Sequence, residues 1–337
     1  MVDRPKVWVS RPTFPDIVAR LDEHFEVTSE THEIAFSRVE LATKLADQDA
    51  AIVGLKERIG AAEIAGAKRL RIVANLSVGY DNLDLTALTM AGIAASNTAD
   101  VLNESVADYT WALLLGAARR VGAAERWLRA GEWKATKFTP WLGMDVRGRT
   151  LGILGMGRIG QAVARRAAGF GMPVIYHNRS SLPQAVEREC NARYVDKQAL
   201  LRESDFLVLV VPLTPQSRHA IGASELALMK PTAVLVNVAR GGIVDDAALA
   251  TALARGDIAA AALDVFEGEP SVHPALLALD NVLLSPHIAS ASHDARRAMT
   301  ALAVDNVMAF FGHGAHAGHP PTILNPTVLA TATTTQP

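Results

Sequence analysis

A cation, a carboxylate and an imidazole follow separate apolar runs in the second half of this sequence. They are Arg240 in an N-x-x-R-G motif, Glu269 before a proline, and His287 in an S-P-H-I motif. Open α/β sheets bind ligands at the carboxyl ends of their strands, so we expect these three side chains at one sheet edge. Such a set suits a small anion that gains or loses a proton. Singly, the three have structural alternatives: a surface helix cap, a turn residue and a buried histidine.

A glycine-rich stretch between an apolar run and a helical run is the second chemical signal. Residues 150–154 have strand length, and Gly155, Gly157 and Gly160 follow with the spacing G-x-G-x-x-G. The first glycine permits a tight turn, the second lets the backbone approach a pyrophosphate, and the third lets helix and strand pack closely. The helix start then presents N–H groups to the phosphates. The stretch predicts that a dinucleotide is bound by Gly155, Met156, Gly157, Arg158, Ile159 and Gly160. The alternative is a glycine turn in an ordinary βα unit.

The choice of dinucleotide depends on the end of the next strand. NAD-binding proteins usually place Asp or Glu there, about 20 residues after the glycines, to bind the ribose 2′-OH. This chain has His177, Asn178, Arg179 and Ser180, with no carboxylate. Arginine and serine offer charge-assisted hydrogen bonds to a 2′-phosphate. We therefore predict that Asn178, Arg179 and Ser180 bind NADPH/NADP in preference to NADH, which is the second candidate. The alternative is an exposed arginine in a βα loop.

Runs of strand length alternate with helical sequence along most of the chain, which predicts parallel sheets. The runs before the glycine-rich stretch are 6–10, 50–53, 70–74 and 92–96, and those after it are 173–177, 206–211, 233–237, 258–263 and 282–285. The expected fold is α/β, with two doubly wound parallel-sheet domains and the active-site cleft between them. A Rossmann dinucleotide-binding domain, residues 104–285, is inserted into a flavodoxin-like substrate-binding domain, residues 1–103 and 286–337.

Composition limits the classes of partner. The chain has 337 residues and a formal net charge of −2, with no basic stripe, so no nucleic acid partner is indicated. The apolar runs are too short to span a bilayer, and the first residues lack the apolar run of a signal peptide, so no membrane partner is expected. The single cysteine, Cys190, excludes an internal disulfide and fits a reducing compartment. The protein is therefore predicted to be cytoplasmic.

The start of the nucleotide domain has features of a subunit contact. Residues 104–120 are typical of a long helix that is apolar nearly all round, so burial is expected on several sides. The irregular stretch that follows contains Trp133 and Trp141, and an exposed loop has little need of two tryptophans. We predict a dimerisation helix and arm within residues 104–145, and a homodimer. The alternative is an arm that packs within one chain.

The tail beyond Gly312 is rich in His, Ala, Gly, Pro and Thr. Its histidines, His313, His316 and His319, are loosely spaced. We interpret the segment as a partly ordered tail and predict no metal site.

The combination of motifs resembles the D-isomer-specific 2-hydroxyacid dehydrogenases. The resemblance runs from about Lys6 to Asn325 and includes S-V-G-Y-D-N-L-D from Ser77, G-x-G-x-x-G, N-x-x-R-G, D-V-F-E-x-E-P and S-P-H-I. Within the family the motifs are most similar to those of the glyoxylate/hydroxypyruvate reductases, including the bacterial branch also called 2-ketogluconate reductase. R-A-G-E-W from Arg129 and G-M-D-V from Gly143 are shared with that group.

The resemblance implies an NAD(P)-dependent dehydrogenase that transfers hydride reversibly between the cofactor and C2 of a small 2-oxoacid. Arg240 would bind the substrate carboxylate and carbonyl oxygen, and the backbone N–H groups of Val78 and Gly79 would bind the carboxylate too. His287 would donate the proton, and Glu269 would hydrogen-bond its other ring nitrogen and keep it protonated near neutral pH. Domain closure over the substrate would assemble the site. The further positions near the cofactor would be Pro212, Val238, Asp264, His287 and Ser290.

The alternatives keep the same fold. One is a dehydrogenase for phosphite or for another D-2-hydroxyacid; formate-oxidising relatives have Gln where Glu269 stands, which counts against that version. Another is a non-enzymatic, dinucleotide-sensing scaffold like the corepressor relatives. Two details depart from a simple match: Ala289 stands where many relatives have Gly, and Glu267 is a second carboxylate beside Glu269. No motif distinguishes glyoxylate, hydroxypyruvate and 2-ketogluconate as the substrate.

Overall fold

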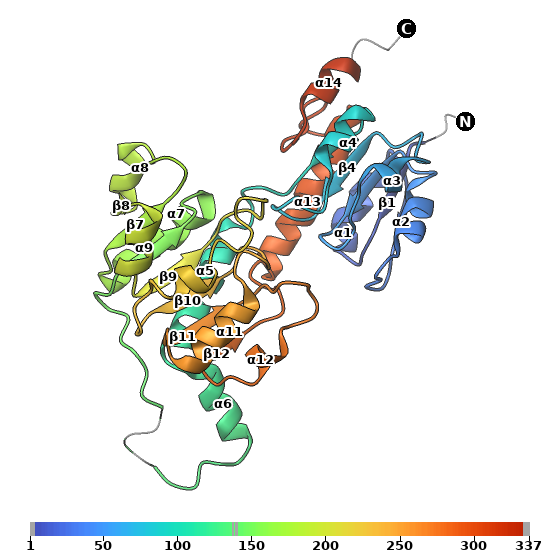
Figure 1. Ribbon diagram of the computed structural model, residues 1–337. Helices are drawn as coiled ribbons and strands as arrows, with labels where there is room; N and C mark the ends of the chain where they lie inside the picture. The colour runs from blue at the N-terminus through green and yellow to red at the C-terminus, as the bar shows by residue number, and fades with distance from the viewer. Residues whose placement is uncertain (1–3, 137, 139–140, 333–337) are drawn as a thin grey trace. The chain divides into compact units, whose positions relative to one another are not determined.

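The computed structural model describes residues 4–136, 138 and 141–332, and the chain divides into two compact units. Met1–Leu102 with Ser292–Pro337 form the first unit, and Asn103–Ala291 form the second (Figure 1). The first border lies one residue earlier, and the second border six residues later, than the sequence-based boundaries.

A parallel sheet lies at the centre of the first unit. Its strands, within the described residues, are β1 (Lys6–Val9), β2 (Glu26–Ser29), β3 (Ala50–Val53), β4 (Ile72–Asn75) and β5 (Ala94–Ser96). They pair in the order β2-β1-β3-β4-β5, and every pairing is parallel. This is the flavodoxin-like order, in which the winding reverses between β1 and β3.

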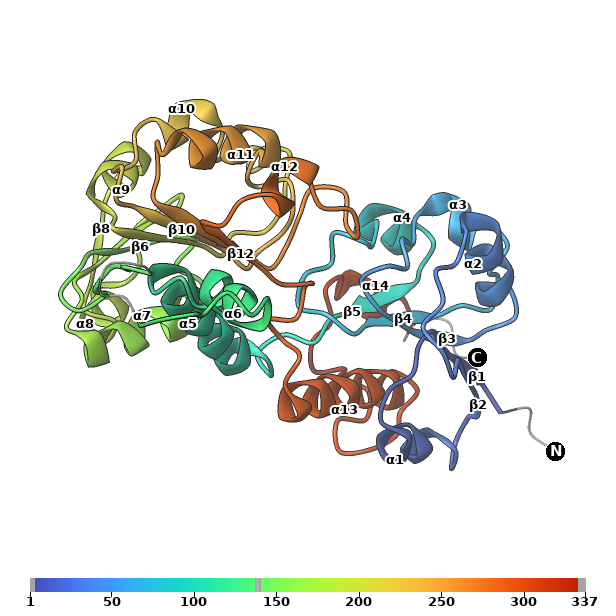
Figure 2. The same ribbon diagram turned by 90° about the horizontal axis from the view of Figure 1, so that it is seen from below.

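Helices cover both faces of this sheet (Figure 2). They are α1 (Pro15–Val18), α2 (Arg38–Leu45), α3 (Ala61–Ile64), α4 (Leu85–Met90), α13 (His293–Phe310) and α14 (Thr327–Ala332), with a 3-10 turn at Ala19–Leu21. Successive strand residues point to opposite faces. Val7 and Val9 therefore pack with α1 and α13, whereas Trp8 packs with α2. Strands buried on both faces appear in the sequence as continuous apolar runs, which is why they could be predicted.

The second unit also contains a parallel sheet. Its strands in the described part of the chain are β6 (Leu151–Leu154), β7 (Val174–His177), β8 (Ala192–Tyr194), β9 (Phe206–Leu209), β10 (Val234–Asn237), β11 (Ala260–Leu263) and β12 (Val282–Leu284). Their order is β12-β11-β10-β9-β6-β7-β8, and every pairing is parallel. This is the Rossmann order with one additional strand.

Two layers of helices flank the second sheet (Figure 2). The helices are α5 (Asn103–Ala118), α6 (Val121–Arg129), α7 (Arg158–Ala167), α8 (Gln184–Glu189), α9 (Lys197–Glu203), α10 (Ala223–Leu226), α11 (Asp246–Arg255) and α12 (Pro274–Leu277), with a 3-10 turn at Ala168–Phe170. The predicted α/β class with two parallel sheets is confirmed. Among the described residues, no helix has both the length and the apolar character needed to cross a membrane.

The two strands that the sequence did not predict, β2 and β8, lie at sheet edges. β2 is mostly exposed, and only one of the three residues of β8 is even partly buried. An edge strand pairs on one side only and does not need an apolar run, so hydrophobic pattern alone misses it.

The prediction of an apolar helix at residues 104–120 is wrong in two respects. It places the end of the helix too late, and it attributes the burial of the helix to a subunit contact. α5 ends at Ala118, and Arg120, with a φ of +56°, separates it from α6. Trp111 of α5 stacks on Phe170 with ring centroids 4.6 Å apart, and its indole N–H donates to Val163 O at 3.0 Å. α5 is apolar nearly all round because the sheet and α7 of its own unit bury it. Its composition is therefore no argument for a subunit contact.

The prediction of a partly ordered tail is wrong for the segment that hydrogen-bonds to β5. Leu324 N–H donates to Ala95 O at 2.8 Å, and Asn325 Oδ1 accepts from Ala95 N–H at 2.7 Å. Val328 is buried in the core of the first unit. The ring of His313 stacks on His24 with centroids 3.9 Å apart. In the described part of the chain, no three His, Cys, Asp or Glu side chains are grouped so as to hold a metal ion.

Candidate active site

The glycine-rich loop joins β6 to α7 in the second unit. Gly155 has a φ of +102°, and a Cβ there would lie 2.9 Å from the backbone of Val210. A Cβ on Gly160 would lie 2.4 Å from the carbonyl oxygen of Gly155. At Gly157 a Cβ would meet nothing within 4 Å, and no side chain caps α7 at this residue. The packing of the protein itself thus requires the first and third glycines, whereas the second borders open space at a helix start that favours anions.

Asn178, Arg179 and Ser180 follow β7 beside this loop. Asn178 Oδ1 accepts a hydrogen bond of 2.7 Å from Met156 N–H, so the asparagine ties the strand end to the loop, a role that the sequence did not reveal. Arg179 and Ser180 are exposed, and neither has a hydrogen bond or ion pair within the described residues. Residues 177–181 contain no carboxylate. The strand end therefore offers an uncompensated positive charge to a ligand.

Arg240 follows β10 on a turn that its neighbours shape. Asn237 is 1% exposed; its Oδ1 accepts from Ala239 N–H at 3.1 Å, and its Nδ2 donates to Arg240 O at 3.2 Å. Gly241 lies so close to the following loop that a Cβ would be 1.7 Å from Phe266 O. The asparagine and glycine of the N-x-x-R-G motif thus hold the backbone that presents the half-buried arginine. The sequence alone indicated no role for either residue.

Glu269 and His287 are in direct contact. Glu269 Oε2 lies 2.7 Å from His287 Nδ1, and its Oε1 accepts from Phe266 N–H at 2.9 Å. Burial acts to raise the pKa of Glu269, but the hydrogen bond and charge of His287, the Phe266 N–H and the charge of Arg240 together bring it below its ordinary value. The carboxylate is therefore ionised at neutral pH. With Nδ1 engaged, the Nε2 atom of the ring is the one that can serve a substrate.

The other nearby carboxylate, Glu267, has different partners. His219 Nε2 lies 2.9 Å from its Oε2, and Arg218 also hydrogen-bonds the side chain. Glu269, and not Glu267, is thus the carboxylate that contacts His287.

A buried carboxylate holds the turn that carries His287. Asp264 is fully buried and accepts from Ser285 Oγ at 2.6 Å, Ile288 N–H at 2.9 Å and Ala289 N–H at 2.8 Å. The backbone N–H of His287 donates to Asp264 O at 2.8 Å, and His287 has a φ of +56°, which is uncommon for a residue with a side chain. The position of Asp264 near the cofactor stays a prediction; in the structure its two carboxylate oxygens accept hydrogen bonds from the turn that carries His287.

The remaining predicted positions belong to two different units of the chain. Pro212 is exposed, Val238 is buried and Ser290 is half-buried, all in the second unit. Val78 and Gly79 lie in the first unit, on the turn after β4, and are half-buried. Their contacts with cofactor or substrate stay predictions.

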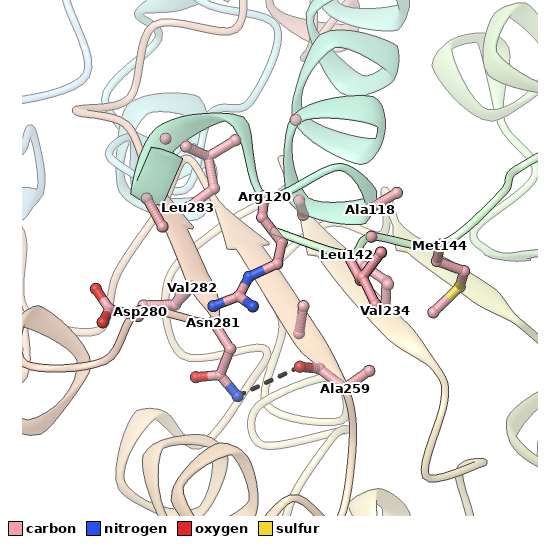
Figure 3. Close-up of a pocket in the computed structure, with 16 residues that line it drawn as sticks. Ala118, Arg120, Leu142, Met144, Val234, Ala259, Asp280, Asn281, Val282 and Leu283 are labelled. Carbon is pink, nitrogen blue, oxygen red and sulfur yellow. Dashed lines mark hydrogen bonds between the residues drawn. The ribbon is translucent and has the colours of Figure 1, made fainter. Parts of the chain in front are cut away.

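A hollow of the second unit is lined by none of the predicted site residues (Figure 3). Arg120, Leu142 and Leu283 line it together with Val234, the first residue of β10. It therefore opens at the amino end of this strand, whereas the predicted catalytic residues follow carboxyl ends. Ligand sites of parallel sheets lie at the carboxyl ends, so this hollow is not the candidate active site.

Comparisons with known proteins agree along nearly the whole chain. The family model described as "D-isomer specific 2-hydroxyacid dehydrogenase, NAD binding domain" matches residues 111–289. The glyoxylate reductase of Thermococcus onnurineus is 48% identical over 331 residues, which cover 97% of each chain. The glyoxylate reductase of Pyrococcus furiosus is 46% identical over 331 residues, again 97% of each chain.

Solved structures show the same similarity. The NADPH-dependent glyoxylate/hydroxypyruvate reductase from Sinorhizobium meliloti, in complex with NADP and malonate, has a TM-score of 0.83 at 38% identity, and 96% of this chain and 98% of that chain are covered. A glyoxylate reductase from Paecilomyes thermophila has a TM-score of 0.85 at 33% identity, with 97% and 100% covered.

The glycines of the loop should separate stability from binding. Gly155→Ala should lower the free energy of unfolding by about 2 kcal/mol or more, because the φ of +102° and the close Val210 backbone both oppose a side chain. Gly157→Ala is the matched control: it should leave stability nearly unchanged but weaken dinucleotide binding, since its methyl group would enter the open space. Urea unfolding and fluorescence titration measure the two effects. Equal stabilities of the two variants would contradict this account of the loop.

Proposed function

This chain belongs to the D-isomer specific 2-hydroxyacid dehydrogenase family, and we propose that it reduces glyoxylate, or a related small 2-oxoacid, to the 2-hydroxyacid with NADPH. Membership makes it an NAD(P)-dependent oxidoreductase, which confirms the predicted enzyme class. The observation that carries the proposal is the 2.7 Å contact between Glu269 Oε2 and His287 Nδ1. The positive charge of Arg240 also acts on Glu269 and lowers its pKa. All three residues belong to the unit that contains the glycine-rich loop. Hydroxypyruvate and 2-ketogluconate are the other candidate substrates.

The reaction adds a hydride to C2 of the 2-oxoacid and a proton to its carbonyl oxygen. The reduced nicotinamide supplies the hydride when bound. Arg240 binds the carboxylate and polarises the carbonyl group, and His287 donates its proton from Nε2 as negative charge develops on the oxygen. Glu269 stabilises the protonated ring through Nδ1. After the product leaves, the ring takes up a proton from water.

The exposed Arg179 and Ser180 support a preference for NADPH. A 2′-phosphate would find a cation and a hydroxyl there, with no carboxylate to repel it. Asn178 also favours NADPH. Its Oδ1 accepts the hydrogen bond from Met156 N–H, so its Nδ2 is left to donate a hydrogen bond to the 2′-phosphate. The relative from Sinorhizobium meliloti, which is described as NADPH-dependent, is in complex with NADP.

The first test is a spectrophotometric assay with NADPH and glyoxylate. The wild-type protein should consume NADPH, and His287→Ala should lower kcat about 100-fold or more through loss of the proton donor, with dinucleotide binding retained. His316→Ala, which alters an exposed histidine of the first unit, is the matched control and should keep full activity. An unchanged rate in His287→Ala would refute its role.

The same assay decides between substrates. Reduction of NADP by phosphite, without turnover of any 2-oxoacid, would refute the proposal and support the phosphite alternative. Hydroxypyruvate and 2-ketogluconate are assayed beside glyoxylate to rank the 2-oxoacids by kcat/KM.

Coenzyme choice is tested by the double variant Asn178→Asp with Arg179→Ala. Aspartate keeps an acceptor for Met156 N–H while it adds a charge that repels the 2′-phosphate. The ratio of kcat/KM with NADPH to kcat/KM with NADH should fall at least about tenfold, as expected for the loss of charge-assisted hydrogen bonds. Arg255→Ala, at an exposed arginine on α11, is the control and should leave the ratio unchanged. A constant ratio in the double variant would show that this loop does not select the coenzyme.

The proposal includes a homodimer, which is supported by the apolar surface around α6 and the arm. Leu128, Trp133, Phe138 and Leu142 are each at least half exposed. We predicted that both tryptophans of the arm pack; Trp141 contacts Trp127 with centroids 5.4 Å apart, but Trp133 is 59% exposed. Monomeric proteins rarely expose such a group of large apolar side chains, so a second copy of the chain is the proposed cover.

Leu142→Glu should shift the protein from dimer to monomer, because a charge would be buried in the subunit contact. Leu277→Glu is a matched control: Leu277 is 63% exposed against 69% for Leu142, but it lies on α12, outside the arm. Sedimentation equilibrium measures the mass. A wild-type monomer, or a Leu142→Glu variant that remains dimeric, would contradict the proposed interface.

A cytoplasmic location is also part of the proposal. Cys190 is a free, buried thiol, and burial raises its pKa. A protein whose one cysteine is buried and forms no disulfide suits a reducing compartment.

A further inference from the structure

The turn after β4 in the first unit has three successive peptide carbonyls, each of which accepts a hydrogen bond. Ser77 O accepts from Thr98 N–H at 3.0 Å. Val78 O accepts from Asn97 Nδ2 at 2.8 Å, and Gly79 O accepts from Asn75 Nδ2 at 2.9 Å. The orientation of the three peptide planes is therefore fixed by hydrogen bonds to their carbonyl oxygens.

A trans peptide directs its N–H group away from its C=O group. The N–H groups opposite these carbonyls belong to Val78, Gly79 and Tyr80, and none of the three peptide bonds is cis. Within the described residues, none of these N–H groups meets an acceptor. Val78 and Gly79 are half-buried and Tyr80 is exposed, so the three residues lie where a ligand can reach them.

Buried amides support this arrangement. Asn75 is fully buried and exchanges hydrogen bonds with Asn82, whose Nδ2 also donates to Gly54 O and Glu57 O at 3.0 Å each. Asn97 is 6% exposed, and its backbone N–H donates a hydrogen bond to Thr322 O, which fixes the position of the residue. Buried amides without partners would be costly, so their hydrogen bonds lock these side chains in place.

We infer that Asn97 and Asn75 are positioning residues that aim the N–H groups of Val78, Gly79 and Tyr80 at the substrate carboxylate. The inference rests on the proposed function, in which Val78 and Gly79 are carboxylate donors, and adds Tyr80 as a third. Successive N–H groups of this kind form a concave site for an anion, and the two oxygens of a carboxylate can accept all three hydrogen bonds. The asparagines touch neither substrate nor cofactor in this account.

The test uses Asn97→Ala and Asn97→Asp in the full-length protein. Alanine removes the donor to Val78 O, and aspartate places an acceptor against it, so the Gly79 N–H loses its orientation. The KM for glyoxylate and the inhibition constant of oxalate, an unreactive dicarboxylate, should both rise at least about fivefold, the effect of one hydrogen bond. The kcat should change less than about threefold, and dinucleotide binding should be unchanged.

Asn325→Asp is the matched control. Asn325 is also buried in the first unit, and its Nδ2 donates to Ile93 O at 2.9 Å, away from the turn. It should lose similar stability without a change in KM or oxalate binding. Unchanged constants in folded Asn97 variants, or an equal rise in Asn325→Asp, would overturn the inference.

Two further measurements keep this test separate from the proposed function. If the wild-type protein does not reduce glyoxylate, the proposed activity fails, but calorimetric titration with oxalate still compares the wild type with the Asn97 variants. If both variants unfold, nuclear magnetic resonance of the wild type decides. The amide signals of Gly79 and Tyr80 should shift on addition of oxalate, and signals that do not move would overturn the inference.

Discussion

The buried carboxylate of Asp264 constrains the turn that carries His287 in the second unit. A carboxylate shielded from water is stable only when hydrogen bonds replace its hydration, and here Ser285 Oγ and the N–H groups of Ile288 and Ala289 do so. These bonds close the turn around His287 and hold it at a φ of +56°, a conformation that costs free energy for a non-glycine residue. The ring is thereby placed 2.7 Å from Glu269. The geometry of the contact between Glu269 and His287 thus depends on the hydrogen bonds around Asp264.

The first unit uses the same physical device with neutral groups. Asn75 and Asn97 donate hydrogen bonds to peptide carbonyls of the turn after β4, and we infer that these bonds orient the N–H groups on the opposite side of each peptide. In both units the proposed ligand-binding groups lie after the carboxyl ends of parallel strands, and buried polar side chains hydrogen-bond to the turns that carry them. The sheets make each unit rigid, and the hydrogen bonds at the strand ends fix the orientation of the turns.

The prediction succeeded where local physics is specific. Buried parallel strands must be apolar on both faces, and the spacing of Gly155, Gly157 and Gly160 admits few backbone paths. It failed at the edge strands β2 and β8, which need no apolar run, and at the end of α5, where a left-handed Arg120 leaves no compositional signal. The cause of burial of α5 was also misjudged, because an apolar helix surface does not reveal whether its own sheet or another subunit covers it.

The sequence by itself determined the fold class, the glycine-rich loop and the presence of Arg240, Glu269 and His287 after apolar strands. These features follow from residue types at short spacing. Only the tertiary structure decided which carboxylate contacts His287, that Asn178 is tied to Met156, and that Asp264 binds the histidine turn. Each of these hydrogen bonds joins residues at least 18 positions apart. Hydrophobic periodicity carries no information about such pairs, because they meet only when the strands that precede them are aligned in one sheet.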